Sequence, residues 1–172
     1  ALGADPDAIL GPLLSDEGVP ALAMAMKRQG CTYLPALGTV LNAWPAAPNP
    51  KHWAALGAQE AQGSTLLAKA QHEEMSLAWR RRIGRQGANP SGILRAVLDI
   101  YLAKVPLALG SGAGLLMVMH GTSRQLEFEL WQEAGIPIQA VLRAATLNSH
   151  RLMRLEGGRL QKGARARKFG KD

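Results

Sequence analysis

The sequence predicts an α/β fold with parallel strands. Short apolar runs bounded by glycine or proline lie at residues 7–14, 31–37 and 105–109, and such runs are typical of buried parallel strands. A segment with helical spacing of its apolar residues separates the first two runs, so these form a strand–helix–strand unit. The third run leads into the glycine-rich loop 110–114, where we expect functional residues to lie.

Length and composition indicate one ordinary domain with its own core. The chain has 172 residues, of which 47% are hydrophobic, which is enough to bury a core. Glycine, proline or charge interrupts every apolar run before the roughly 18 residues that a membrane span needs. Residues 1–7 lack the pattern of a secretory signal. The sequence therefore predicts a cytoplasmic protein with no membrane partner.

The first predicted helix lies between the first two strands. We expect Ser15 to cap it, with two acidic residues in its first turn, where the helix dipole favours them. Gly30 is expected to end it. Its apolar stripe at helical spacing comprises Val19, Leu22, Ala23 and Met26.

The remainder of the chain is predicted to be mostly helical. Residues 38–50 form a loop with three prolines, and loops of this length are usually functional or disordered. Helices are expected at residues 53–85 with a break at Gly63, from a cap near Asn89 to Tyr101, at residues 124–133 and at residues 136–155.

The net charge of +7 is concentrated in two basic clusters, at residues 80–85 and in the tail from Arg159 to Lys171. The tail has no apolar periodicity and is predicted to be flexible, so we divide the chain into a domain at residues 1–156 and a basic tail at 157–172. Polyanion binding through the tail is a weaker alternative function. Phe169 is the one aromatic residue of the tail, which argues against a nucleic-acid partner.

Several pieces of the chain resemble, in the same order, the last part of the metal-dependent amidohydrolase barrel. Residues 7–17, 26–37 and 105–114 are similar to its sixth, seventh and eighth strands, and residues 134–148 and 158–163 to its closing helix and re-entry segment. The imidazolonepropionase-like and Xaa-Pro-dipeptidase-like branches are the most similar. The resemblance implies a partial (β/α)8 TIM-type barrel of about three β/α units, with extra helices and a basic tail.

The resemblance also implies a metal, which this chain alone is not expected to hold. Family members use zinc or another divalent metal to activate the water that attacks an amide or cyclic amide C–N bond. Leu10 stands near the position of a family histidine, and Gly112 replaces the family aspartate. The other family ligands would precede Ala1. The chain alone is therefore predicted to be inactive, and its expected partner is a second copy or a complementing N-terminal barrel half.

The resemblance places six candidate residues on the active face of the barrel. His120 belongs either to this face or to a structural loop. Glu127 is either its partner in a proton relay or a residue with a helix-capping or solvent role. The candidates are Leu10, Gly110, Ser111, Gly112, His120 and Glu127.

Other sequence patterns give weaker support for a functional site. Cys31 has no activating base beside it and is predicted to be a core residue. His72 begins a zinc-helix pattern, but Ser76 stands where the second histidine would be. The glycine-rich loop lacks the lysine of a nucleotide-binding loop, and Ser111 has no triad partners nearby in sequence. Asn148 is expected to fix helix packing or a cap, and the four tryptophans are expected in the core or at an interface.

Two classes of function stay open at this point. The first is an amidohydrolase-type enzyme that is truncated, degenerate or imperfectly recorded. The second is a non-catalytic half-barrel that binds a partner through its unpaired sheet edges, which invite association.

Overall fold

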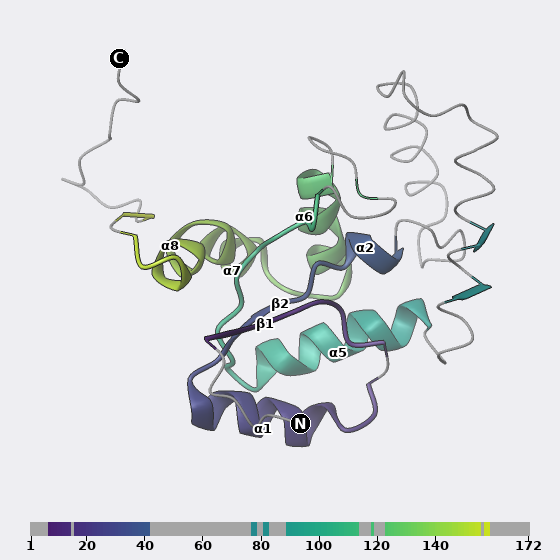
Figure 1. The fold of residues 1–172 in the computed structure, drawn as a ribbon, viewed down its shortest axis with the longest axis horizontal. Coiled ribbons are helices and arrows are strands. Elements are labelled where there is room, and N and C mark those ends of the chain that lie inside the picture. The colour runs from purple at the N-terminus through teal and green to yellow at the C-terminus, as the bar shows by residue number, and fades with distance from the viewer. Residues whose placement is uncertain are drawn as a thin grey trace, which may run out of the picture.

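The computed structural model describes residues 7–14, 16–41, 77–78, 81–82, 89–113, 118, 123–155 and 157–158. Its elements are β1 (Ala8–Leu10), α1 (Val19–Gln29), β2 (Thr32–Leu34), α2 (Gly38–Leu41), α5 (Pro90–Leu102), α6 (Ser123–Glu133), α7 (Ile138–Arg143), the π-helix η1 (Ala144–Asn148) and α8 (Ser149–Leu152). Figure 1 shows the two strands surrounded by helices. The described part of the chain is therefore of the mixed α/β type.

The predicted strand–helix–strand unit is present. β1 and β2 pair in parallel, with Ile9 opposite Tyr33, and α1 connects them. The N-cap residue of α1 is Gly18, with φ +74, and not the predicted Ser15, which lies outside the described residues. The predicted end at Gly30 is confirmed, since Gly30 has φ +68 and its N–H bonds to carbonyls of the last turn.

The third predicted strand is shorter than expected. Of the predicted strand at residues 105–109, Leu107 is the one residue that forms a β-bridge with a described residue, and it pairs in parallel with Tyr33. The Tyr33 N–H donates to the Pro106 carbonyl at 2.9 Å, and the Ala108 N–H donates to the Tyr33 carbonyl at 3.0 Å. We call residues 106–109 the Leu107 segment. β2 thus lies between β1 and the Leu107 segment, so the order in space follows the order in the chain.

The outer edge of the Leu107 segment is covered by η1. The carbonyl of Leu107 points away from β2 and accepts a hydrogen bond from Asn148 Nδ2 at 2.7 Å. The Leu109 N–H, on the same edge, donates to the Ala144 carbonyl at 3.3 Å. We call the bond between Asn148 and Leu107 the Asn148 anchor. It confirms the expectation that Asn148 fixes helix packing.

The outer edge of β1 is open within the described residues. Alternation along the strand turns the backbone groups of Ala8 and Leu10 away from β2. No described residue forms a hydrogen bond with these groups. One edge of this small sheet is therefore covered by a helix, and the other edge has no hydrogen-bond partner among the described residues.

Helix α5 begins near its predicted cap. The Asn89 side chain accepts a hydrogen bond from the Gly92 N–H at 2.6 Å, and Pro90 lies in the first turn. The helix continues to Leu102, one residue beyond the predicted end. Lys104 follows it with φ +65, a conformation that side chains other than those of glycine and asparagine rarely adopt.

Helices lie on both sides of the sheet. In Figure 1, α1 and α5 lie below the strands and α6 and α8 lie above them. Helices on both faces of a parallel sheet are typical of an α/β sandwich, and the described residues form no closed barrel. The largest buried side chains between these layers include Met26, Tyr33, Leu37, Leu41, Ile93, Ile100, Leu130, Trp131 and Ile136.

Several predicted segments differ in detail. The predicted loop at residues 38–50 begins with the short helix α2, while residues 42–50 lie outside the described part. Of the predicted helix at 53–85, residues 77–78 and 81–82 are described, and they are helical. The last helix begins at Ile138, two residues later than predicted, because Pro137 is its N-cap residue. Polyanion binding through the tail stays a prediction, since residues 159–172 are not described.

Candidate functional site

The parallel segments end on the same side of the sheet, where the resemblance predicts the functional loops. β1 ends at Leu10, which lies opposite Leu34 of β2. Gly110 follows the Leu107 segment, and a Cβ atom on Gly110 would lie 3.4 Å from the Leu34 side chain. The structure therefore brings Leu10 and Gly110 to the two sides of Leu34.

The side chains at these strand ends offer few polar groups. The Leu10 side chain is apolar, and residue 10 is 68% exposed. Gly110 and Gly112 have no side chain. Ser111 Oγ accepts a hydrogen bond from the Ala113 N–H at 3.3 Å. The hydroxyl group of the loop thus stabilises the loop itself.

A metal site does not fit these residues. Leu10 and Gly112, which the resemblance predicts at ligand positions, provide no nitrogen, oxygen or sulfur side-chain atom. Gly112 has φ +64, which a residue with a Cβ atom rarely adopts. Across the described ranges, no group of three or more His, Cys, Asp and Glu side chains is arranged to hold a metal ion.

The backbone is strained where the chain leaves β2. Ala36 has φ +45, in the left-handed region that costs a residue with a Cβ atom about 1 kcal/mol. Its carbonyl accepts hydrogen bonds from the Thr39 N–H at 3.1 Å and from Thr39 Oγ1 at 2.7 Å. A β-branched residue is less tolerant of this conformation.

Glu127 is a buried carboxyl group beside the exit of β2. It lies on α6 and is 0% exposed. Its Oε1 accepts a hydrogen bond from the Gly38 N–H at 2.6 Å, and its Oε2 accepts one from Trp131 Nε1 at 3.1 Å. Gly38 is the first residue of α2, so the carboxyl group caps α2 and joins it to α6. We call the bond between Glu127 and Gly38 the Glu127 anchor.

Burial raises the pKa of Glu127 to about 7, because a carboxylate that has lost its water is disfavoured relative to the neutral acid. The N–H groups of Gly38, Leu37 and Trp131 favour the ionised form and lower the pKa, but burial is the larger effect. The carboxyl group therefore changes its charge near neutral pH.

The other predicted residues divide between the core and the part that is not described. His120, the predicted relay partner of Glu127, lies outside the described residues, as do His72 and three of the four tryptophans. Trp131 and Cys31 are fully buried, in agreement with the prediction of core residues. The proton relay between His120 and Glu127 stays a prediction.

Tyr33 is a buried residue whose hydroxyl forms a hydrogen bond that no sequence pattern indicated. Its hydroxyl accepts a hydrogen bond from the Leu13 N–H at 3.1 Å, which ties the chain after β1 to β2. Burial raises the pKa of Tyr33 above its usual range, the Leu13 N–H lowers it, and the charge of Glu127 raises it further. The apolar run predicts burial of Tyr33, but the partner of its hydroxyl depends on the tertiary structure.

Neither a protein-family model, nor a curated protein, nor a solved structure matches this chain. Among the helices that the structure describes, none combines the length and the apolar character needed to cross a membrane.

Proposed function

We propose that this chain is a degenerate amidohydrolase-type barrel segment whose strand ends do not provide the metal ligands for C–N bond hydrolysis. The supporting observation is the parallel order of β1, β2 and the Leu107 segment. This order follows the chain, with α1 and α5 on one face of the sheet (Figure 1), as in consecutive units of a (β/α) barrel. The other face, which would be the inside of a closed barrel, is covered by α6 and α8 (Figure 1). The positions that the resemblance assigns to family ligands are Leu10, the last residue of β1, and Gly112, which follows the Leu107 segment.

The chemistry that this segment lacks is the activation of water. In the resembling family, a metal lowers the pKa of a bound water and so produces the attacking hydroxide. Leu10 and Gly112 cannot coordinate a metal. Hydrolysis of an amide or cyclic amide would need ligands from outside the described residues, such as those of a complementing barrel half.

Zinc binding tests this proposal. Equilibrium dialysis of the purified chain against zinc, followed by elemental analysis, is expected to give well below one tightly held zinc per chain. The double variant Leu10→His/Gly112→Asp is expected to hold zinc more tightly, because the two new ligands would lie at strand ends on the same side of the sheet, with β2 between them. A displaced pair, Leu10→His/Gln132→Asp, is the matched control.

Two results would contradict the proposal. Stoichiometric, tight zinc in the unmodified chain would show that the segment is not degenerate. Equal zinc affinity for the double variant and its displaced control would show that positions 10 and 112 do not face one site, and the barrel assignment would be withdrawn.

A second candidate function is that of an interaction module, and the open edge of β1 favours it. Unpaired strand edges bind further strands through main-chain hydrogen bonds. The partner that we propose is a second copy of this chain. Pairing of β1 with β1 across a two-fold axis satisfies the outward backbone groups of both copies and covers the exposed Leu10 side chains.

Light scattering during size-exclusion chromatography tests the second candidate. We expect the unmodified chain to be a dimer and Leu10→Lys to be a monomer, because a charge on an edge strand opposes pairing. Met24→Lys is the control, since Met24 on α1 is 63% exposed, which is comparable with Leu10 at 68%. A monomeric unmodified chain, or the same loss of the dimer in both variants, would contradict β1 pairing.

A further inference from the structure

A surface pocket of about 370 Å³ lies on the amino-terminal side of the Leu107 segment. It is distinct from the strand ends described above, because it surrounds the start of this segment. The end of α5 forms one wall, and α7, η1 and α8 form the other. We call it the basic pocket. Its lining residues are Tyr101, Lys104, Val105, Pro106, Leu107, Ala140, Arg143, Asn148 and Arg151.

Three cationic side chains from three different elements line the basic pocket. Lys104 follows α5, Arg143 ends α7 and Arg151 lies in α8. None of the described lining residues is acidic. None of the three cations forms an ion pair with any residue that the structure describes. The pocket therefore has a local excess of positive charge.

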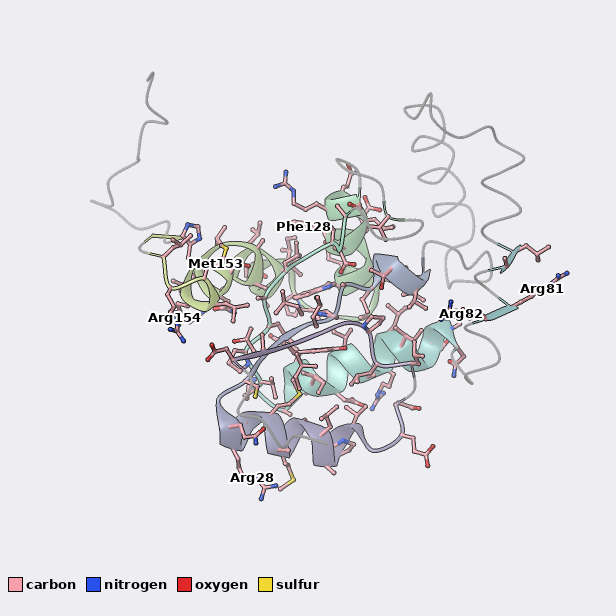
Figure 2. The ribbon with its side chains drawn as sticks, in the orientation of Figure 1. Arg28, Arg81, Arg82, Phe128, Met153 and Arg154 are labelled. Carbon is pink, nitrogen blue, oxygen red and sulfur yellow. The ribbon has the colours of Figure 1, made fainter. Side chains whose placement is uncertain are left out.

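The neighbouring Arg154 differs from the three cations of the pocket, because it has an acidic partner. Figure 2 shows Arg154 just beyond α8. Its guanidinium pairs with Asp7 at 3.2 Å, so its charge is partly compensated. Arg151, three residues earlier, has no such partner within the described residues. Arg151 thus adds to the pocket a charge that is unpaired in the described part of the chain, whereas the charge of Arg154 beside it is paired.

The π-helix contributes to this arrangement. In a regular α-helix, residues eight apart differ by about 80° around the axis. Arg143 and Arg151 are separated in this way, but η1 lies between them and its wider turn reduces the angle per residue. Both arginines line one pocket as a result. π-Helical turns occur frequently at functional sites.

Lys104 adopts a conformation that favours glycine. Its φ is +65, and it occupies the position after a helix where glycine is most common. The left-handed conformation is strained for a lysine, and such strain is concentrated at functional sites. The Lys104 ammonium lies 5.7 Å from the centre of the Tyr101 ring. Lysine at this position thus directs a cation to the pocket at the expense of backbone strain.

The uncharged lining residues indicate that a ligand of this pocket also has an apolar part. Pro106 and Ala140 offer apolar surface, and Tyr101 adds an aromatic ring. The volume falls in the range of small-molecule sites. Two guanidinium groups and an ammonium group favour a dianionic group, since guanidinium binds phosphate oxygens in pairs.

We propose that the basic pocket binds a small phosphate monoester, with the phosphate on Lys104, Arg143 and Arg151 and the organic part against Tyr101 and Pro106. The proposal does not depend on the amidohydrolase assignment. The ligand is bound and not transformed, so no covalent step is involved.

Calorimetric titration with phenyl phosphate, inorganic phosphate and phenol tests this proposal. We expect phenyl phosphate to bind more tightly than inorganic phosphate, and phenol not to bind. Lys104→Gly and Arg143→Gln are each expected to weaken binding at least about tenfold, because each removes a charged hydrogen bond. Lys104→Gly also relieves the left-handed strain, so its thermal midpoint is expected to stay level or rise, which excludes misfolding as the cause.

Arg28→Gln is the control, because Arg28 is an exposed basic residue in the last turn of α1 (Figure 2) and does not line the pocket. The proposal is overturned if phenyl phosphate does not bind, or if Arg28→Gln weakens binding as much as Lys104→Gly. It is also overturned if a single-stranded oligonucleotide binds more tightly than phenyl phosphate and Lys104→Gly leaves that binding unchanged.

Discussion

The Glu127 anchor and the Asn148 anchor both hold a helix in place, but the first uses an ionisable side chain and the second a neutral one. Each bonds a helical side chain to a backbone group near a strand, at Gly38 in one case and at Leu107 in the other. The Glu127 carboxyl group is ionisable and fully buried, whereas the Asn148 amide is neutral and half-buried. The attachment of α6 to α2 is therefore expected to depend on pH, whereas the attachment of η1 to the Leu107 segment is not.

The largest expected effect is that of pH on stability. Glu127 has an ordinary pKa of 4.5 and a pKa of about 7 in the folded chain. Between these values the folded state binds more protons, so stability falls as pH rises. The contribution of Glu127 is fully present below about pH 4.5 and is lost by about pH 7, with a loss of about 3 kcal/mol.

Urea unfolding at several pH values measures this effect, with Glu127→Gln as the reference because its side chain does not titrate. The difference in unfolding free energy between the two proteins should change across this window. If the difference in unfolding free energy between the two proteins were constant from pH 4.5 to pH 7, the Glu127 anchor would not titrate. The two anchors would then not differ in their dependence on pH.

The next largest effect is expected for Glu127→Ala at pH 5. This change leaves the Gly38 N–H and Trp131 Nε1 without their acceptor, and we expect a loss of roughly 2 kcal/mol in unfolding free energy. Glu129→Ala on the same helix is the control, since Glu129 is only partly buried, and its loss is expected to be below about 0.5 kcal/mol. Equal losses for the two variants would refute a special role for Glu127.

Asn148→Ala is expected to have a smaller effect. The Leu107 carbonyl loses a neutral hydrogen bond on a half-buried edge, which costs about 1 kcal/mol. The loss should be the same at pH 5 and pH 8, in contrast to that of Glu127→Ala. Urea unfolding measures it, and Gln139→Ala on the exposed side of α7 is the control. A loss that changes with pH would contradict the neutral character of the Asn148 anchor.

The smallest effect is expected for Ser149→Ala. Ser149 Oγ donates to the Ala144 carbonyl at 2.7 Å, within the helical segment itself, and its loss should cost about 0.5 kcal/mol. Hydrogen exchange of the Leu109 N–H, which bonds to the same carbonyl, should be little changed. If Ser149→Ala accelerates this exchange more than Asn148→Ala does, then Ser149 and not Asn148 holds η1 on the sheet.

The sequence predicts those features of the fold that depend only on neighbouring residues, such as the ends of helices. Gly30 ends α1 because it adopts a left-handed conformation, and Asn89 caps α5 with its side chain. Both roles need only neighbouring residues, so the residue types at these positions are sufficient. The helical and apolar periodicities were sufficient to place most of the described elements.

Contacts between distant residues were not predictable in the same way. The bond of Glu127 to Gly38 joins residues 89 positions apart, and no local pattern indicates that the carboxyl group is buried. The run at 105–109 has the composition of a strand, but within the described residues its outer edge bonds to η1 and not to another strand.

Tyr33 forms the backbone pairings on both sides of β2, with Ile9 and with Leu107. Ile9 is close to Tyr33 in sequence, and α1 brings the two together, whereas Leu107 is far away along the chain. The entropy lost on closing a loop increases with its length, and distant contacts slow folding. We therefore expect β1, α1 and β2 to associate early, and the docking of the Leu107 segment onto Tyr33 to limit the rate at which the sheet is completed.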